Sequence, residues 1–182
     1  QFYGAKDHKN LSRTLHTAYA FAIVTGAIVG LIGFWITEKV LIAMKTPSEL
    51  MADSVIYLHI YFCGMIFNIV YNMGASILRA VGDSRRPLYV LIMTCGLNIF
   101  FDIMLVVFLK MGVMGVAIAT VSCQGISACM VTWILIKGNS LFRLKIREIR
   151  FYMASLQSVL RIGIPAALEA TMYTIANLII QI

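Results

Sequence analysis

The stretch PLYVLIMTCGLNIFFDIMLVVFL, residues 87–109, is an apolar run with one carboxylate placed well away from either end. A helix needs about 20 apolar residues to cross the hydrocarbon core of a bilayer, and this run is long enough. Asn98 and Asp102 are four residues apart, so they share one face of the predicted helix. A charged side chain at this depth costs at least about 2.5–3.5 kcal/mol on insertion scales, and it marks a functional site by default. The stretch therefore predicts a membrane span with a functional polar face.

The composition is typical of a membrane protein. Of the 182 residues, 60% are hydrophobic and 13% are charged, whereas a soluble domain has about 25% charged residues. The mean hydropathy is +0.88, and the charged residues are concentrated between the apolar runs. We therefore predict an all-α fold, a polytopic bundle of membrane helices that crosses the cell (plasma) membrane several times.

Four apolar runs are each long enough to cross a bilayer. They lie at about residues 17–36, 54–78, 88–109 and 113–136, and a fifth run begins near Ile162 and continues to Ile182. The sequence begins with QFYGAKDHKN, without an initiator Met and without a signal-peptide pattern. We therefore expect it to be an internal piece of a longer chain.

Lys and Arg indicate the orientation, because cytoplasmic loops are enriched in both. Residues 1–16, 79–87 and 137–160 carry most of them, while the connections between these segments contain only Lys39, Lys45 and Lys110. We place the three basic segments in the cytoplasm. The net charge of +7 is then mainly a topology signal. Nucleic acid is not an expected partner, because the basic residues are divided among separate loops.

Polar side chains recur at helical spacing in two further spans. They are Tyr57, Tyr61, Asn68 and Asn72 in the second span, and Thr120, Gln124 and Ser127 in the fourth. Their oxygen atoms are suitable ligands for a small hard cation. Hydrogen bonds between helices, or to the helix's own backbone, are the alternative explanation. The Cys and His residues show no metal-like spacing, so no cofactor is expected apart from a coupling ion.

Four motifs occur in a characteristic order: YGAKD at residues 3–7, YNMGASILRAVGDSRRP at 71–87, LNIFFD at 97–102 and GVMGVAIAT at 112–120. Together they resemble the multidrug and toxic compound extrusion (MATE) transporters over essentially the whole sequence. The resemblance implies part of a bundle of twelve helices in two six-helix lobes. Residues 1–136 would hold helices three to six of the amino-terminal lobe. Residues 137–160 would be the cytoplasmic linker between the lobes, and 161–182 the start of the seventh helix.

The resemblance also implies a site in the cavity of the amino-terminal lobe. The residues that correspond to the family's ion-coupling site are Asp102, Asn98, Asn72 and Thr120, and if the ion is Na⁺ its expected ligands are Asp102, Asn98 and Thr120. Further candidates for the substrate cavity are Tyr57, Tyr61, Asn68, Gln124 and Glu169. Glu169 is a secondary candidate, since it lies closer to Pro165 than the family's seventh-helix Glu lies to its Pro. The alternative for Glu169 is a polar contact between lobes. The family's first-helix Asp is not among these residues.

The predicted function is antiport by alternating access, in which H⁺ or Na⁺ enters and amphipathic, mainly cationic drugs leave. The expected partners are the bilayer and small molecules, and the full-length protein is expected to be monomeric. A lipid-linked oligosaccharide flippase is the alternative, but it should have a more basic cavity. A cation channel would need symmetry or repeats that the sequence lacks. An enzyme would need paired acids, a His cluster or a Ser-His arrangement, and Asp102 has no such partner nearby in the sequence.

Overall fold

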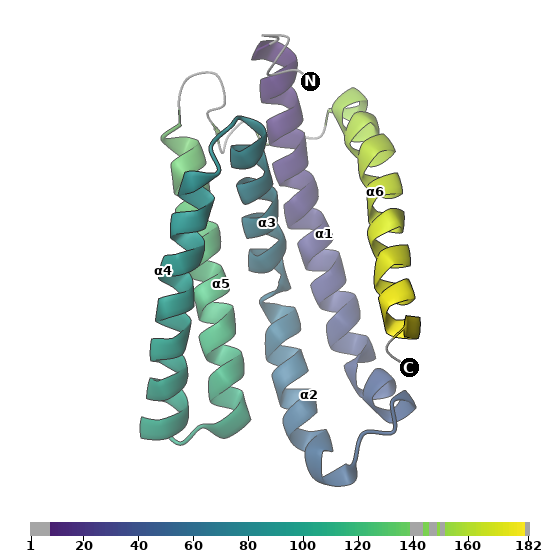
Figure 1. Ribbon diagram of the computed structural model, residues 1–182, viewed down its shortest axis with the longest axis vertical. Coiled ribbons are helices and arrows are strands. Elements are labelled where there is room, and N and C mark those ends of the chain that lie inside the picture. Colours follow the sequence, from purple (N-terminus) through teal and green to yellow (C-terminus); the bar gives the residue numbers. More distant parts are fainter. Residues whose placement is uncertain (1–7, 139–143, 146–148, 150–151, 181–182) are drawn as a thin grey trace.

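The computed structural model describes residues 8–138, 144–145, 149 and 152–180. Its elements are α1 (His8–Ala43), α2 (Ser48–Cys63), α3 (Met65–Ala80), α4 (Arg85–Asp102), the π-helix η1 (Ile103–Phe108), α5 (Gly112–Ile136) and α6 (Met153–Ile180) (Figure 1). By length and composition, α1, α4 with η1, and α5 are each able to cross a membrane, as is the pair α2 and α3 taken as one bent span. The predicted all-α class is confirmed. The four expected spans correspond to these helices.

The connections between spans alternate between two ends of the bundle. The start of α1, the α3–α4 connection and the start of α6 lie at one end, and the α1–α2 and α4–α5 connections lie at the other (Figure 1). The described parts of the three basic segments expected in the cytoplasm therefore lie towards one end, as four crossings of a membrane require.

The turns between helices follow from local chemistry. After α1, Lys45 adopts a φ of 54°, and Pro47 directly precedes the first residue of α2. Gly82 has a φ of 89° after α3, a conformation that glycine adopts without steric cost. Asp83 Oδ1 then accepts the backbone N–H of Arg86 at 3.2 Å, and Asp83 Oδ2 lies 3.1 Å from the Arg86 guanidinium. These contacts hold the first turn of α4.

The second span differs from the expected single helix over 54–78, because it is bent. α2 and α3 meet at Gly64 with an angle of 47° between them. Gly64 is buried, and a Cβ atom at this position would lie 2.6 Å from both Cγ atoms of Val121 on α5. The absent side chain therefore lets the bend approach α5 closely. Side chains before and after the bend no longer share one continuous face.

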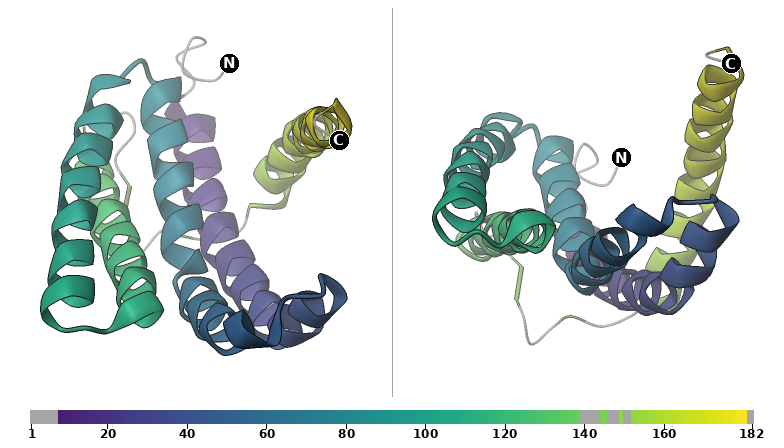
Figure 2. Two further views of the ribbon diagram at one scale, coloured as in Figure 1. Left: turned by 60° about the horizontal axis from the view of Figure 1, so that its bottom comes forward. Right: turned by 90° about the horizontal axis from the view of Figure 1, so that it is seen from below.

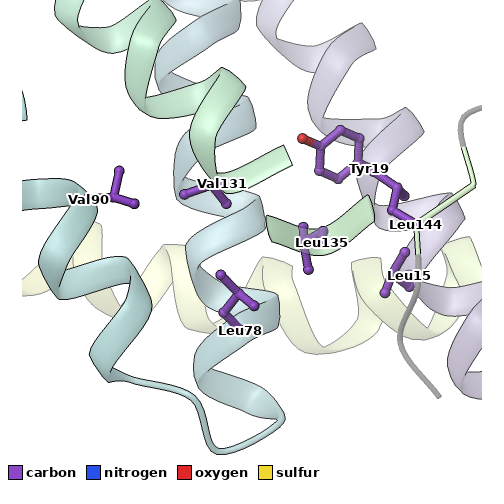
Figure 3. Close-up of a cluster of buried hydrophobic side chains, with 7 residues drawn as sticks. All are labelled: Leu15, Tyr19, Leu78, Val90, Val131, Leu135 and Leu144. Atoms are coloured by element: carbon purple, nitrogen blue, oxygen red, sulfur yellow. The ribbon is translucent and has the colours of Figure 1, made fainter. Parts of the chain in front are cut away.

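The buried apolar core lies towards the end of the bundle where α1 begins. It consists of Leu15, Tyr19, Leu78, Val90, Val131, Leu135 and Leu144 (Figure 3). Away from this core, large apolar side chains point outward, and Trp35 and Phe108 are 78% and 77% exposed. Helices that are apolar all round are typical of membrane spans, so this outward surface is suited to lipid and to further helices.

The segment that follows α5 is attached to the first turns of α1. Leu144 is buried in the core, and its N–H donates to the Leu135 carbonyl oxygen at 3.0 Å. The Lys145 N–H donates to Nε2 of the buried His16 at 3.0 Å, while Nδ1 of His16 donates to the Ser12 carbonyl oxygen at 2.7 Å. These two bonds require neutral His16 in one tautomer, with the proton on Nδ1.

Helix α6, which corresponds to the run expected to begin near residue 161, begins earlier than the sequence predicted. Its first residue, Met153, lies within the segment expected to be linker, because no Pro or Gly interrupts the helix before Gly163. Just before it, the Tyr152 N–H donates to Thr17 Oγ1 at 3.2 Å. α6 packs along α1 and diverges from the other helices (Figure 2).

Candidate functional site

A cavity of about 350 Å³ opens between α3, α4 and α5. It forms because α5 packs against both α3 and α4. Its amide and hydroxyl side chains include Asn68 and Asn72 from α3, Asn98 from α4, and Thr120, Gln124 and Ser127 from α5. None of the described residues that line it is basic or acidic. The fold thus brings together polar residues from three separate spans of the sequence.

Asp102 is the last residue of α4, one turn beyond Asn98, and it is not itself among the residues that line the cavity. It is half-buried, and its Oδ1 atom has no hydrogen-bond partner within the described residues. It also interacts electrostatically with Cys123, a cavity residue whose side chain is within hydrogen-bonding reach of Asn98. One carboxylate oxygen is therefore buried, one turn from the cavity residue Asn98, without a hydrogen-bond partner in the described part of the chain.

A π-helix begins directly after Asp102. In η1 and its cap, the Leu109 N–H donates to the Met104 carbonyl oxygen, five residues earlier, at 3.1 Å. π-helical turns are rare and often occur at functional sites. The sequence contains no Pro or Gly between Asp102 and Leu109 that would have predicted this change of pattern.

Gln124, like Asp102, has a side-chain oxygen atom that is left without a donor among the described residues. Gln124 Oε1 is buried and has no hydrogen-bond partner in the described part of the chain. Ser127 differs, because its hydroxyl donates to the Cys123 carbonyl oxygen at 2.9 Å. Most buried polar atoms in proteins are paired, so unpaired acceptors at Asp102 and Gln124 favour an incoming proton or a hard cation.

Three sequence candidates lie elsewhere. Tyr57 lines a second cavity, of about 380 Å³, together with Leu50, Asp53 and Val113. Tyr61 stacks on Tyr57, with 6.2 Å between the ring centroids. Both tyrosines lie before the bend at Gly64, whereas Asn68 and Asn72 lie after it. Glu169 is exposed on α6, which packs along α1.

The cavity also contains residues that the sequence did not single out. They are Tyr71, Leu91, Thr94, Cys95 and Cys123. Thr94 and Cys95 precede Asn98 by four and three residues, so helical spacing could have placed them on its face. The spacing of the Cys residues indicates no site, and only packing reveals that Cys123 lines the cavity. No group of three or more His, Cys, Asp or Glu side chains that could hold a metal ion occurs among the described residues.

Comparison with known sequences gives consistent relatives. The sequence model of the MatE family matches residues 1–104. The chain is 30% identical over 174 residues to "Probable multidrug resistance protein YpnP" of Bacillus subtilis, covering 94% of this chain and 38% of the relative. It is 27% identical over 170 residues to "Probable multidrug resistance protein NorM" of Thermotoga maritima, covering 91% of this chain and 36% of that relative. The chain thus spans less than half of the length of either relative.

Solved structures show the same fold. A MOP superfamily transporter from Pyrococcus furiosus superposes with a TM-score of 0.87 at 22% identity, over 96% of this chain and 39% of that one. The outward-facing conformation of a multidrug resistance MATE family transporter gives a TM-score of 0.78 at 20% identity, over 94% of this chain and 43% of that one. The inward-facing conformation of such a transporter gives a TM-score of 0.72 at 20% identity, over 92% of this chain and 44% of that one.

Proposed function

The chain belongs to the MatE family, whose sequence model covers more than half of it, and from this premise we propose that it forms part of an antiporter. In our proposal the full-length protein exports amphipathic, mainly cationic organic compounds across the cell membrane in exchange for H⁺ or Na⁺. The relatives named as multidrug resistance proteins support the export of drugs. Members of this family are multi-pass membrane transporters and not enzymes.

The observation that supports the coupling role is the unpaired oxygen of Asp102 beside the polar cavity. A carboxylate in a membrane helix is stabilised when it binds a proton or a cation. In our proposal Asp102 binds the coupling ion, and Asn98, Asn72 and Thr120 supply neutral oxygen ligands. Gln124 and Asn68 belong to the same cavity.

Ion binding must favour one conformation of the transporter in order to drive export. An ion shifts a conformational equilibrium only by as much as its affinity differs between the two states. We propose that the ion-loaded site no longer attracts a cationic drug, because the charge of Asp102 is neutralised. The drug then leaves on the outer side as the ion is bound.

The test uses the full-length protein in a bacterium that lacks its own drug pumps. Ethidium efflux is followed under an imposed H⁺ or Na⁺ gradient, for the wild type and for Asp102→Asn at equal membrane abundance. We expect Asp102→Asn to lower ion-driven efflux by at least about tenfold, because the substitution removes the carboxylate that the described residues contribute to the site. The gradient that drives wild-type efflux identifies the ion.

Two outcomes would contradict the proposal. Unchanged efflux in Asp102→Asn would make Asp102 a structural residue and move the coupling site, with Glu169 as the next candidate. A wild type that exports no ethidium or related organic cation would favour transport of another substrate, such as a lipid-linked oligosaccharide.

A further inference from the structure

Two hydrogen bonds join Asn68 and Asn72, which lie one turn apart on α3. Nδ2 of Asn72 lies 2.9 Å from the backbone carbonyl oxygen of Asn68 and 3.0 Å from the side-chain oxygen Oδ1 of Asn68. The amide nitrogen of an asparagine carries two N–H donors. Both donors of Asn72 are therefore used within its own helix.

The backbone carbonyl determines the orientation of the Asn72 amide. A carbonyl oxygen only accepts hydrogen bonds, so the Asn72 atom 2.9 Å from it is the nitrogen and not the oxygen. The second N–H of Asn72 then needs an acceptor, which turns Oδ1 of Asn68 towards it. The Asn72 oxygen remains, and within the described residues it makes no hydrogen bond.

Both asparagines line the cavity between α3, α4 and α5. A neutral amide attracts a cation through its oxygen, whereas its N–H groups repel one. We infer that Asn68 is a positioning residue for the coupling ion: by accepting an N–H of Asn72, it keeps the Asn72 oxygen available to the ion. This inference rests on the proposed function.

Removal of the Asn68 acceptor has a defined consequence. One N–H of Asn72 would lose its partner, and only the backbone carbonyl would still oppose rotation of the amide. The Asn72 oxygen would then face the cavity for a smaller fraction of the time. The affinity for the ion then falls.

The test uses the full-length protein in proteoliposomes, with ethidium as the transported probe. The quantity measured is the concentration of Na⁺ or H⁺ that gives half-maximal efflux. Asn68→Leu preserves the size of the side chain and removes the acceptor, and we expect this concentration to rise about fivefold, in line with the loss of one hydrogen bond. Asn68→Asp preserves an acceptor oxygen, so it should not raise the ion concentration.

A double-mutant comparison separates a positioning role from a merely structural one. If Asn68 acts through Asn72, then Asn68→Leu combined with Asn72→Leu should behave like Asn72→Leu alone. Ser76→Ala is the matched control. Ser76 lies one turn beyond Asn72 on α3, is exposed and does not line the cavity. It should retain the wild-type ion dependence.

The outcomes distinguish this inference from the proposed function. The inference is wrong if Asn72→Leu raises the half-maximal ion concentration and Asn68→Leu does not, or if the two effects multiply in the double variant. A wild type without ion-driven efflux overturns the proposed function, and the inference with it. If Asn68→Leu does not accumulate in the membrane, Asn68→Ala replaces it with the same expected rise.

Discussion

At the scale of single residues, Asp102 and Gln124 each have a buried oxygen without a hydrogen-bond partner among the described residues. An unpaired buried polar atom costs about 1–3 kcal/mol. The buried hydroxyl of Tyr19 in the core is paired, since it is hydrogen-bonded to Thr132. Thr14 Oγ1 on α1 is also buried and unpaired among these residues, so such atoms are not confined to the cavity. At Asp102 and Gln124, we interpret the cost as a consequence of the proposed ion binding.

This interpretation predicts opposite effects at Gln124 and Tyr19. Gln124→Leu should leave the free energy of unfolding unchanged or raise it by up to about 1 kcal/mol, because it removes an acceptor that has no donor. The same substitution should weaken ion-driven efflux. Tyr19→Phe should lower the free energy of unfolding by about 1 kcal/mol, because it leaves Thr132 without this partner. Thermal unfolding of the purified full-length protein in detergent measures both, and an equal loss in the two variants would contradict the interpretation.

At the scale of helices, the bend between α2 and α3 decides which polar residues meet. The residues after Gly64 line the cavity beside α4 and α5, whereas Tyr57 before it lines a different cavity. Kinks of this size are usually found at Pro, Gly or π-helical turns, and here the glycine lies against Val121. Spacing on an ideal helix placed Tyr57 and Asn72 on one face, and that pattern was interrupted by the bend.

The close approach at Gly64 predicts a compensating pair of substitutions. Gly64→Ala should lower the free energy of unfolding by about 1–3 kcal/mol, since its Cβ would lie 2.6 Å from a stiff β-branched side chain. Val121→Ala in the same protein should recover part of this loss. Gly96→Ala is the control, because a Cβ atom there would meet nothing within 4 Å. Equal losses in Gly64→Ala and Gly64→Ala/Val121→Ala, measured by thermal unfolding, would show that Val121 is not the cause.

At the scale of the whole molecule, the two ends of the bundle differ. The apolar core and the attachment of Leu144 and Lys145 to α1 lie at the end with the basic connections (Figures 1 and 3). The polar cavity lies beyond this core, along α3, α4 and α5. The arrangement joins the segment after α5 to α1 and to the end of α5.

The orientation in the membrane is tested with single cysteines in a full-length protein whose native cysteines have been replaced. Ser84→Cys lies in the α3–α4 connection and Lys110→Cys in the α4–α5 connection, and both positions are exposed. A thiol reagent that does not cross membranes should label Lys110→Cys in intact cells, and Ser84→Cys only after the cells are opened. Lys45→Cys should label like Lys110→Cys. The reverse pattern would overturn the cytoplasmic assignment of the basic segments.

The sequence by itself determined the all-α class, the four spans, the alternation of their connections and the polar positions within them. These features are local: apolar length makes a span, and helical spacing places Asn98, Asp102, Thr120 and Gln124 on the faces of their own helices. The residues of the cavity that share a helix were therefore within reach of prediction.

Only the tertiary structure decided which of these faces meet. Tyr57 and Asn72 line different cavities on either side of the bend at Gly64, the packing of α5 brings Cys123 to Asn98, and the π-helix begins immediately after Asp102. Each depends on contacts between residues that are distant in sequence, or on a backbone hydrogen-bonding pattern that no residue type specifies. Helical periodicity assigns a side chain to a face, but the neighbouring helix decides what that face contacts.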